Sequence, residues 1–144
     1  MRIDGLHHGG LSVSDFDAAL AWWHRHFGFE LLREWGEPDL RMGLIGRDGV
    51  HVELFCGAGA APGPDETRGV MESFGQRGWK HLAFAVPDLS SAIEGLRADG
   101  VEIIVEPVRG GPSGYAYAFL RDPDGNQVEL VETSQEPAGD QPIP

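Results

Sequence analysis

Several features are missing from this sequence, and each absence excludes a class of protein. Cys56 is the single cysteine, so the chain cannot close an intramolecular disulfide. No apolar run approaches the length of a membrane span, and the first residues lack the apolar core of a signal peptide. We therefore expect a cytoplasmic protein.

Positive charge is also scarce. The chain has 11 Lys and Arg against 23 Asp and Glu, a formal net charge of -12. Because nucleic acids and anionic membrane surfaces attract basic proteins, this balance argues against both as partners. The 144 residues are enough for one domain, or for two small modules that share a core, to fold unaided.

What the sequence does contain is an internal repeat. Residues 48–55 are echoed by residues 124–131, and each copy is a turn that leads into a strand with one glutamate, Glu53 or Glu129. The start of the chain recurs as well, since His8 matches His81 at an offset of 73, whereas the glutamates match at 76. Two copies of so long a unit indicate two modules that pair and not a solenoid.

Each half reads as a strand, a helix and three further strands. Alternation predicts a first strand over residues 6–13, and helical spacing predicts a helix that Ser14 caps and Gly28 ends. The remaining expected elements are strands 29–35, 40–46, 50–56, 80–86, 101–106, 115–121 and 126–132 and a helix 89–99. This divides the chain into a first module (1–56), a linker that can form a short helix (57–78), a second module (79–132) and a disordered tail (133–144).

Two histidines and two glutamates occupy corresponding places in the halves. His8 and His81 belong to the first strand of each half, and Glu53 and Glu129 to the last; all point away from the apolar faces that pack on the helices. If the sheets curve, the four side chains meet in one cavity. Two imidazoles and two carboxylates suit a borderline divalent ion. Small neighbours on the same faces leave space for a substrate: Gly10, Ser12, Ala83 and Ala85.

Each of these residues also has a simpler explanation. A single strand histidine is more often structural than a ligand, but repeat-equivalent partners favour the ligand interpretation for His8. His51 shares the inward direction of Glu53 and either supports a ligand or lines a polar wall. Phe55 and Tyr117 are candidates to line a substrate pocket, although ordinary β packing explains aromatic side chains there equally well.

The motifs around these four residues give the chain a family resemblance. It resembles the vicinal oxygen chelate superfamily, which groups glyoxalases, bleomycin-resistance proteins and extradiol dioxygenases, over residues 6–132. The resemblance implies an α+β fold of two paired βαβββ modules that form a curved, partly open, barrel-like mixed sheet with helices outside. It also implies a homodimer with sites at or near the subunit interface.

The order His8, Glu53, His81, Glu129 is similar to the ligand set of bacterial glyoxalase I. This implies one divalent ion (nickel, cobalt, zinc or manganese, with iron less favoured) and proton transfer through a metal-stabilised enediolate on a small oxygenated substrate. By analogy Glu129 is preferred over Glu53 as the base. Residues 107–111 resemble that enzyme's mouth loop, with Arg109 available for an anion. Two departures speak against glutathione: Ser12 and Gly57 stand where glyoxalase I has arginine and asparagine.

Three other functions remain open. Residues 19–28 and 70–81 look like methylmalonyl-CoA epimerase, although such enzymes usually lack the Asp-Pro-Asp-Gly turn of residues 122–125. A drug-binding resistance protein would use the same cavity without turnover, but sequestration needs no metal ligands. An extradiol dioxygenase needs ferrous iron with a vacant face, part of which Glu53 would occupy.

Overall fold

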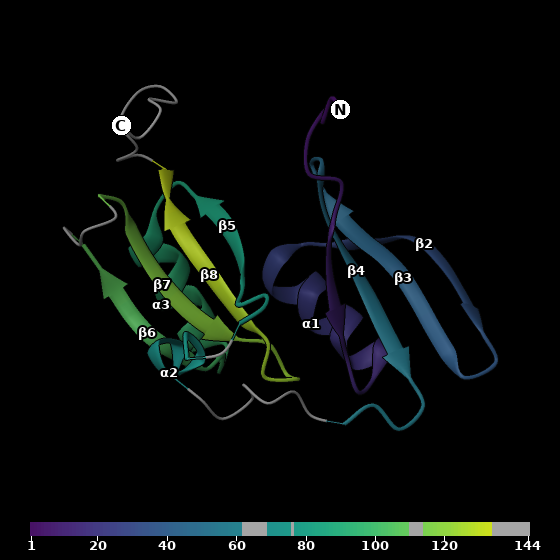
Figure 1. Ribbon diagram of the computed structural model, residues 1–144. Helices are drawn as coiled ribbons and strands as arrows, with labels where there is room; N and C mark the ends of the chain where they lie inside the picture. The colour runs from purple at the N-terminus through teal and green to yellow at the C-terminus, as the bar shows by residue number, and fades with distance from the viewer. Residues whose placement is uncertain (62–68, 76, 110–113, 134–144) are drawn as a thin grey trace. The chain divides into compact units, whose positions relative to one another are not determined.

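The computed structural model describes residues 1–61, 69–75, 77–109 and 114–133 (Figure 1). Residues 134–144 of the expected tail (133–144), the linker residues 62–68 and the glycines of the expected mouth loop lie outside the described residues. By its contacts the chain separates into two compact units. Unit 1 is Met1–Arg68 with the turn Asp122–Asn126, and unit 2 is Gly69–Arg121 with Gln127–Pro144.

Unit 1 has the predicted order of a strand, a helix and three strands. Its elements are β1 (Gly9–Ser12), α1 (Phe16–Phe27), β2 (Glu30–Glu37), β3 (Leu40–Arg47) and β4 (Val50–Gly57). The four strands form one sheet in the order β1-β4-β3-β2, in which β1 runs parallel to β4 and the other neighbours are antiparallel.

Unit 2 repeats this topology. It contains α2 (Val70–Ser73), β5 (Leu82–Val86), α3 (Leu89–Ala98), β6 (Ile103–Val108), β7 (Ala116–Arg121) and β8 (Gln127–Glu132). The sheet order is β5-β8-β7-β6, again with one parallel pair, β5 with β8. The predicted α+β fold of two βαβββ modules is thus confirmed, and neither four-stranded sheet closes on itself.

The helices form where local sequence provides both a start and a stop. Asp15 caps α1, because its Oδ1 accepts the backbone N–H of Ala18 at 3.0 Å, and Gly28 ends it in the left-handed conformation with φ 67°. The prediction of Ser14 as the cap is wrong, since the residue at the cap position is Asp15, one position later. Asp88 caps α3 in the same way as Asp15 caps α1, through Ser91 N–H at 2.9 Å.

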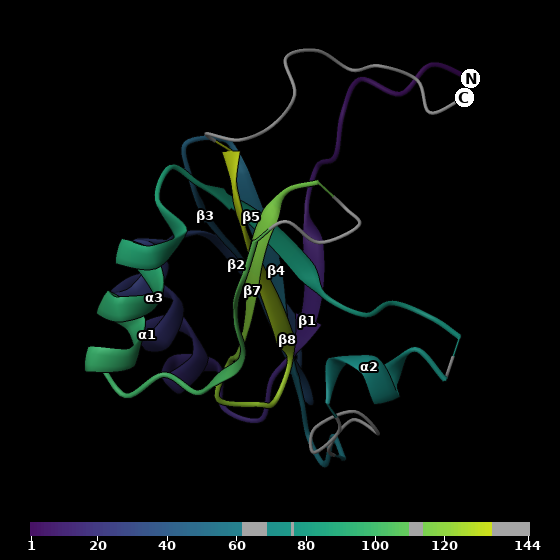
Figure 2. The ribbon, with the colours of Figure 1, turned by 90° about the vertical axis from the view of Figure 1, so that its left-hand side faces the viewer.

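Helices α1 and α3 each pack on one face of the sheet of their own unit (Figures 1 and 2). Apolar side chains at helical spacing meet alternate strand residues there, and both cores are fully buried. In unit 1 the core is Val13, Phe16, Ala19, Trp23, Phe29, Ile45, Val52 and Leu54. In unit 2 it is Leu89, Ile93, Leu96, Val101, Ala116, Ala118, Leu120, Val128 and Leu130.

The remaining differences from the sequence prediction concern element bounds. The strand expected at 101–106 begins two residues later, because Val101 is buried after the helix stop at Gly100 and its N–H bonds Leu96. The short helix expected within the linker (57–78) is the single turn α2, and residues 62–68 and 76 of this linker lie outside the described residues. Among the described helices, none has the length and apolar character needed to cross a membrane.

Candidate metal centre

His8 and Glu53 lie side by side in unit 1. His8 directly precedes β1, and Glu53 stands in β4 with Gly10 as its neighbour in the parallel pair. His8 Nε2 lies 3.2 Å from Glu53 Oε2, and the two side chains are 36% and 15% exposed. A half-buried imidazole and carboxylate therefore meet at hydrogen-bond distance on the face of the sheet away from α1.

His81 and Glu129 form the same arrangement in unit 2. His81 directly precedes β5, and Glu129 in β8 has Ala83 as its neighbour. His81 Nε2 lies 3.0 Å from Glu129 Oε2, and the Phe119 ring meets the imidazole edge to face at 5.0 Å between centroids. A hollow of about 460 Å³ opens beside His81, lined also by residues 78–80.

The surroundings of Glu129 favour its neutral form. Burial raises the pKa of the Glu129 carboxyl, and the contact with His81 opposes part of that shift. When Glu129 is ionised, its carboxylate only accepts, so His81 Nε2 donates to it. His81 Nδ1 is then left buried without a hydrogen-bond partner among the described residues.

The paired atoms fit a divalent metal ion. Imidazole nitrogen and carboxylate oxygen are the donors that zinc, nickel, cobalt and manganese accept. Adjacent octahedral ligands about 2.1 Å from an ion stand about 3.0 Å apart, which is close to the 3.2 and 3.0 Å separations within the pairs. Each unit supplies two such donors; the described residues contain no group of three or more His, Cys, Asp or Glu placed to hold a metal.

His7 is a further neighbour of the first pair, although it has no repeat partner in the sequence. Its Nδ1 lies 2.7 Å from His8 Nδ1, and its carbonyl oxygen lies 3.2 Å from His51 Nδ1. His51 thus reaches the pair through His7. Two features of the sequence indicate that His7 lies near this pair: it directly precedes His8, and His51 points to the same face as Glu53.

The predicted substrate residues of the strands lie on the same faces as the glutamates. Ser12 is exposed at the end of β1, and the half-buried Phe55 ring lies against Gly10, where an added Cβ would meet it at 3.0 Å. Tyr117 stands between Tyr115 and Phe119 in a row of edge-to-face rings on β7. Their contact with a substrate stays a prediction.

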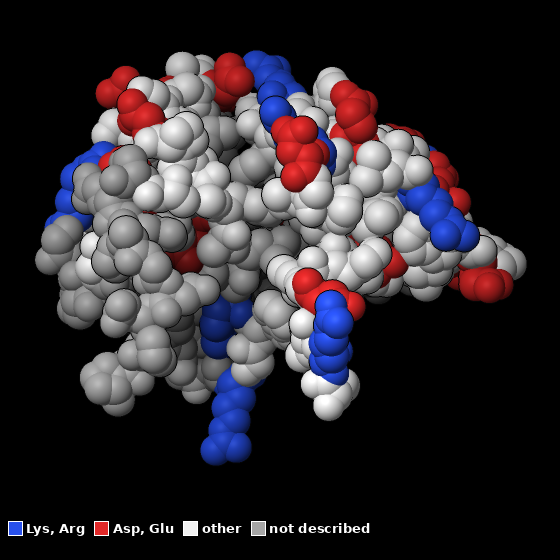
Figure 3. All heavy atoms as spheres, turned by 90° about the horizontal axis from the view of Figure 1, so that it is seen from above, with Lys and Arg blue, Asp and Glu red and all other residues white. Residues whose placement is uncertain are grey.

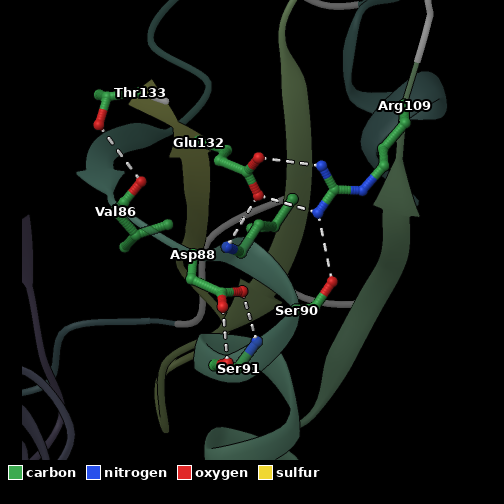
Figure 4. A network of polar contacts seen from close by, with 8 residues as sticks. Val86, Asp88, Ser90, Ser91, Arg109, Glu132 and Thr133 are labelled. Carbon is green, nitrogen blue, oxygen red and sulfur yellow. Dashed lines mark hydrogen bonds and ion pairs between the residues drawn. The ribbon is translucent and has the colours of Figure 1, made fainter. Parts of the chain in front are cut away.

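Arg109 has a different environment from the one expected. Its guanidinium binds both oxygens of the buried Glu132, at 3.0 and 2.8 Å, and donates to Ser90 (Figure 4). Glu132 also accepts the backbone N–H of Leu89 at 3.1 Å, on the helix side of the sheet. The guanidinium that was expected to be available for an anion is engaged by a carboxylate of its own unit.

The turn Asp122–Asn126 holds the junction of β1 and α1. Asp124 accepts the Ser14 N–H at 2.8 Å, and the Asn126 amide donates to the Ser12 carbonyl. Asp122 is buried and accepts from Asp124 and Asn126 N–H and from the Asn126 side chain. Burial raises the pKa of Asp122 to about 6.

Surface charge gives no second candidate site on the face seen in Figure 3. Acidic and basic side chains of the described residues are interspersed there, and neither sign forms a broad field.

Comparison with known proteins extends these observations. The chain is 32% identical over 138 residues to the uncharacterised protein YwkD of Bacillus subtilis, covering 92% of this chain and 99% of that protein. It is 27% identical to the lactoylglutathione lyase of Haemophilus influenzae, covering 92% and 95%. A glyoxalase family protein from Enterococcus faecalis has a similar structure, with a TM-score of 0.77, 25% identity and coverage of 92% and 100%. The family model described as Glyoxalase/Bleomycin resistance protein/Dioxygenase superfamily matches residues 5–130, and the chain belongs to this superfamily.

Proposed function

We propose that this protein is a divalent-metal-dependent lyase or isomerase. It moves a proton at a carbon next to a carbonyl group of a small oxygenated substrate. The observation that carries the proposal is the recurrence of one His–Glu contact in both units, at 3.2 and 3.0 Å. The similarity to a lactoylglutathione lyase supports the reaction class.

The donors for the metal are His8, Glu53, His81 and Glu129. When bound, a divalent ion polarises a substrate carbonyl and makes the neighbouring C–H more acidic. Each histidine contacts its glutamate through Nε2. The same imidazole nitrogen and carboxylate oxygen would bind the cation. Phe55 fills the space beside Gly10, whereas the small side chain of Ala83, next to Glu129, leaves room for the substrate.

Glu129 is the residue that we assign to the proton transfer. Its Oε2 contacts His81, and we assign the proton transfer to the other oxygen, Oε1. The raised pKa brings this carboxyl closer to the range in which a group both accepts and returns a proton near neutral pH. Oε1 takes the proton from one carbon and delivers it to the same or the adjacent carbon.

Metal content and proton exchange test the proposal. Protein purified without added metal should contain about one nickel, cobalt, zinc or manganese ion for each full donor set. In deuterium oxide, the metal-loaded protein should exchange the proton of a compound within a panel of hemithioacetals, 2-hydroxyacyl compounds and acyl-CoA thioesters. Glu129→Gln should retain the fold and lose exchange, whereas the exposed Glu94→Gln on α3 should keep it. Metal-free protein with full exchange activity would refute the proposal.

A further inference from the structure

The sheet of unit 1 has one buried face and one half-exposed face. On β3 and β4, the side toward α1 carries buried residues such as Gly43, Ile45 and Leu54. The other side carries residues that are only partly buried: Met42, Leu44, His51, Glu53 and Phe55. We call these five residues, with Arg33 and Trp35 of β2, the open face. Half-exposed apolar side chains beside a polar pair are what a ligand surface requires.

A β-bulge places Arg33 on this face. Leu31 pairs with Ile45 on the helix side, but the register shifts after it, and Arg33 pairs with Leu44. In a regular strand, Leu31 and Arg33 would lie on the same face of the sheet. Because Leu32 is an extra residue at the bulge, Arg33 and the later residues of β2 lie on the opposite face from Leu31. Trp35 accordingly pairs with Met42.

The register lines up the open face in two rows across the strands. One row is Gly10, Glu53, Leu44 and Arg33, and the other is Ser12, Phe55, Met42 and Trp35. Arg33 is therefore two strands from Glu53, a backbone separation of about 10 Å. Between the glutamate and the arginine lie only the side chains of Leu44 and Met42, which are apolar.

Arg33 is a cation without an acidic partner. Its guanidinium carbon lies 5.7 Å from the centre of the Trp35 ring, and among the described residues no carboxylate pairs with it. Other arginines in or next to the two sheets have carboxylate partners, such as Arg41 with Glu34 and Arg109 with Glu132. In a chain of net charge -12, an unpaired guanidinium on a partly apolar face attracts an anion.

We propose that the open face binds the far end of the substrate, an apolar chain that crosses Leu44 and Met42 and ends in an anionic group on Arg33. The inference rests on the proposed function in one respect: the reacting end of the same molecule lies at the His8–Glu53 pair. The substrate class is thus an oxygenated compound with a carboxylate or phosphate several carbons away. Arg33 determines specificity and takes no part in proton transfer.

Binding of simple probes to metal-free protein tests this separately from catalysis. Octanoate and octyl phosphate carry the anion on an apolar chain, and octanamide is the neutral control. Calorimetry should show both anions bound more tightly than octanamide, and whichever anion binds better identifies the natural terminal group. In amide-detected NMR, shifts should map to Arg33, Trp35, Met42 and Leu44.

Matched variants assign the effect to Arg33. Arg33→Gln should weaken anion binding roughly three- to tenfold, the range for loss of one partly exposed charged contact, and leave octanamide unchanged. Arg33→Lys should restore most of the affinity. Arg47→Gln makes the same charge change on β3, where the side chain reaches Asp48 and the Phe27 carbonyl, and should change neither probe.

The outcomes separate the two proposals. Equal binding of octanoate and octanamide, or an Arg33→Gln variant that binds anions as wild type does, would overturn the assignment of Arg33. If metal-loaded wild-type protein exchanges no proton of any compound in the panel, the proposed function is wrong. The assignment of Arg33 from the binding of octanoate and octyl phosphate would not be affected by that result. If both hold, 2-oxo acids with a distant carboxylate should have a KM that rises in Arg33→Gln while kcat is kept.

Discussion

The chemistry of this protein is concentrated in two residue pairs of similar geometry. His8 with Glu53 and His81 with Glu129 each bring an imidazole nitrogen and a carboxylate oxygen to hydrogen-bond distance. Burial differs between the pairs, since the Glu129 side chain is 9% exposed against 15% for Glu53. Burial raises the pKa of the Glu129 carboxyl, which is the basis for giving it the proton transfer.

Removing one carboxylate should weaken metal binding. Glu53→Gln replaces an anionic donor by a neutral amide, so we expect metal affinity to fall by about tenfold or more. Competition with a chelating dye measures the dissociation constant. Glu37→Gln, an exposed position on β2, is the control for loss of one negative charge. Unchanged affinity in Glu53→Gln would remove this residue from the ligand set.

Asp122 should make stability depend on pH. Its pKa is about 6 in the folded protein and near the ordinary value of 3.8 when unfolded. The folded state therefore holds the proton more firmly, and the stabilisation present below pH 3.8 is lost as the pH rises toward 6. The full effect is about 1–3 kcal/mol.

Urea unfolding between pH 4 and 7 compares wild type with Asp122→Asn. The difference in unfolding free energy between the two proteins should change with pH over this window in favour of the variant as the pH rises. Asp99→Asn, at the exposed end of α3, is the matched control for a lost carboxylate. A pH-independent difference would contradict the raised pKa.

At the scale of elements, an arginine in each unit links the first turn of the main helix, α1 or α3, to a hairpin of the sheet. In unit 2 Arg109 reaches Ser90 in the first turn of α3, and in unit 1 Arg41 binds Asp17 in the first turn of α1 at 2.9 Å. Asp17 and Ser90 are repeat-equivalent, at the offset of 73. The two contacts use different strands, so the repeat preserves the role of the arginine and not its position.

Glu132 should be a stabilising residue of unit 2. It is buried, binds Arg109 with both oxygens and accepts the first N–H of α3. Glu132→Gln loses the charge-assisted bonds and turns an N–H donor toward the guanidinium, and we expect a cost of about 1–3 kcal/mol. Chemical unfolding measures it. Glu106→Gln, which loses an exposed pair with Arg97, should change stability far less.

Two glycines should respond to alanine in opposite ways. An added Cβ at Gly43 on β3 would lie 2.4 Å from Phe16 Cζ, so Gly43→Ala should push α1 from its sheet at a cost of about 1–3 kcal/mol. At Gly95 in α3 no atom lies within 4 Å of the new methyl group. Gly95→Ala should stabilise by about 0.5–1 kcal/mol, because alanine favours the helix. Thermal unfolding tests both; equal effects would contradict the packing of Phe16 on Gly43.

For the whole molecule, metal binding and folding should be coupled. A ligand that binds only the folded state stabilises it by about 2.7 kcal/mol at a concentration of 100 times its dissociation constant. Added nickel or zinc should therefore raise the midpoint of thermal unfolding, and a chelator should reverse the change. The double variant Glu53→Gln, Glu129→Gln should show no such response, since it lacks both carboxylate donors.

Much of the fold could be predicted from the sequence because the signals are local. Asp88, the helical spacing of Leu89, Ile93 and Leu96, and the stop at Gly100 define α3 to within a residue. The alternation around Glu53 and Glu129 defines β4 and β8, and the repeat paired each glutamate with its histidine. Ser14 was the error among the caps: Ser14 and Asp15 are both good capping residues, and in the structure Asp15 accepts the N–H of Ala18.

The sequence by itself determined the two modules, the facing of the strands that carry Glu53 and Glu129, and the four candidate ligands, because side-chain period and repetition are properties of the chain alone. The tertiary structure decided which charges meet. Arg109 is bound to Glu132, and Arg33 faces the apolar row beside Glu53. Both outcomes depend on the pairing of the strands. An extra residue at a bulge turns the later side chains of a strand to the opposite face, and the local sequence does not show where such a bulge lies.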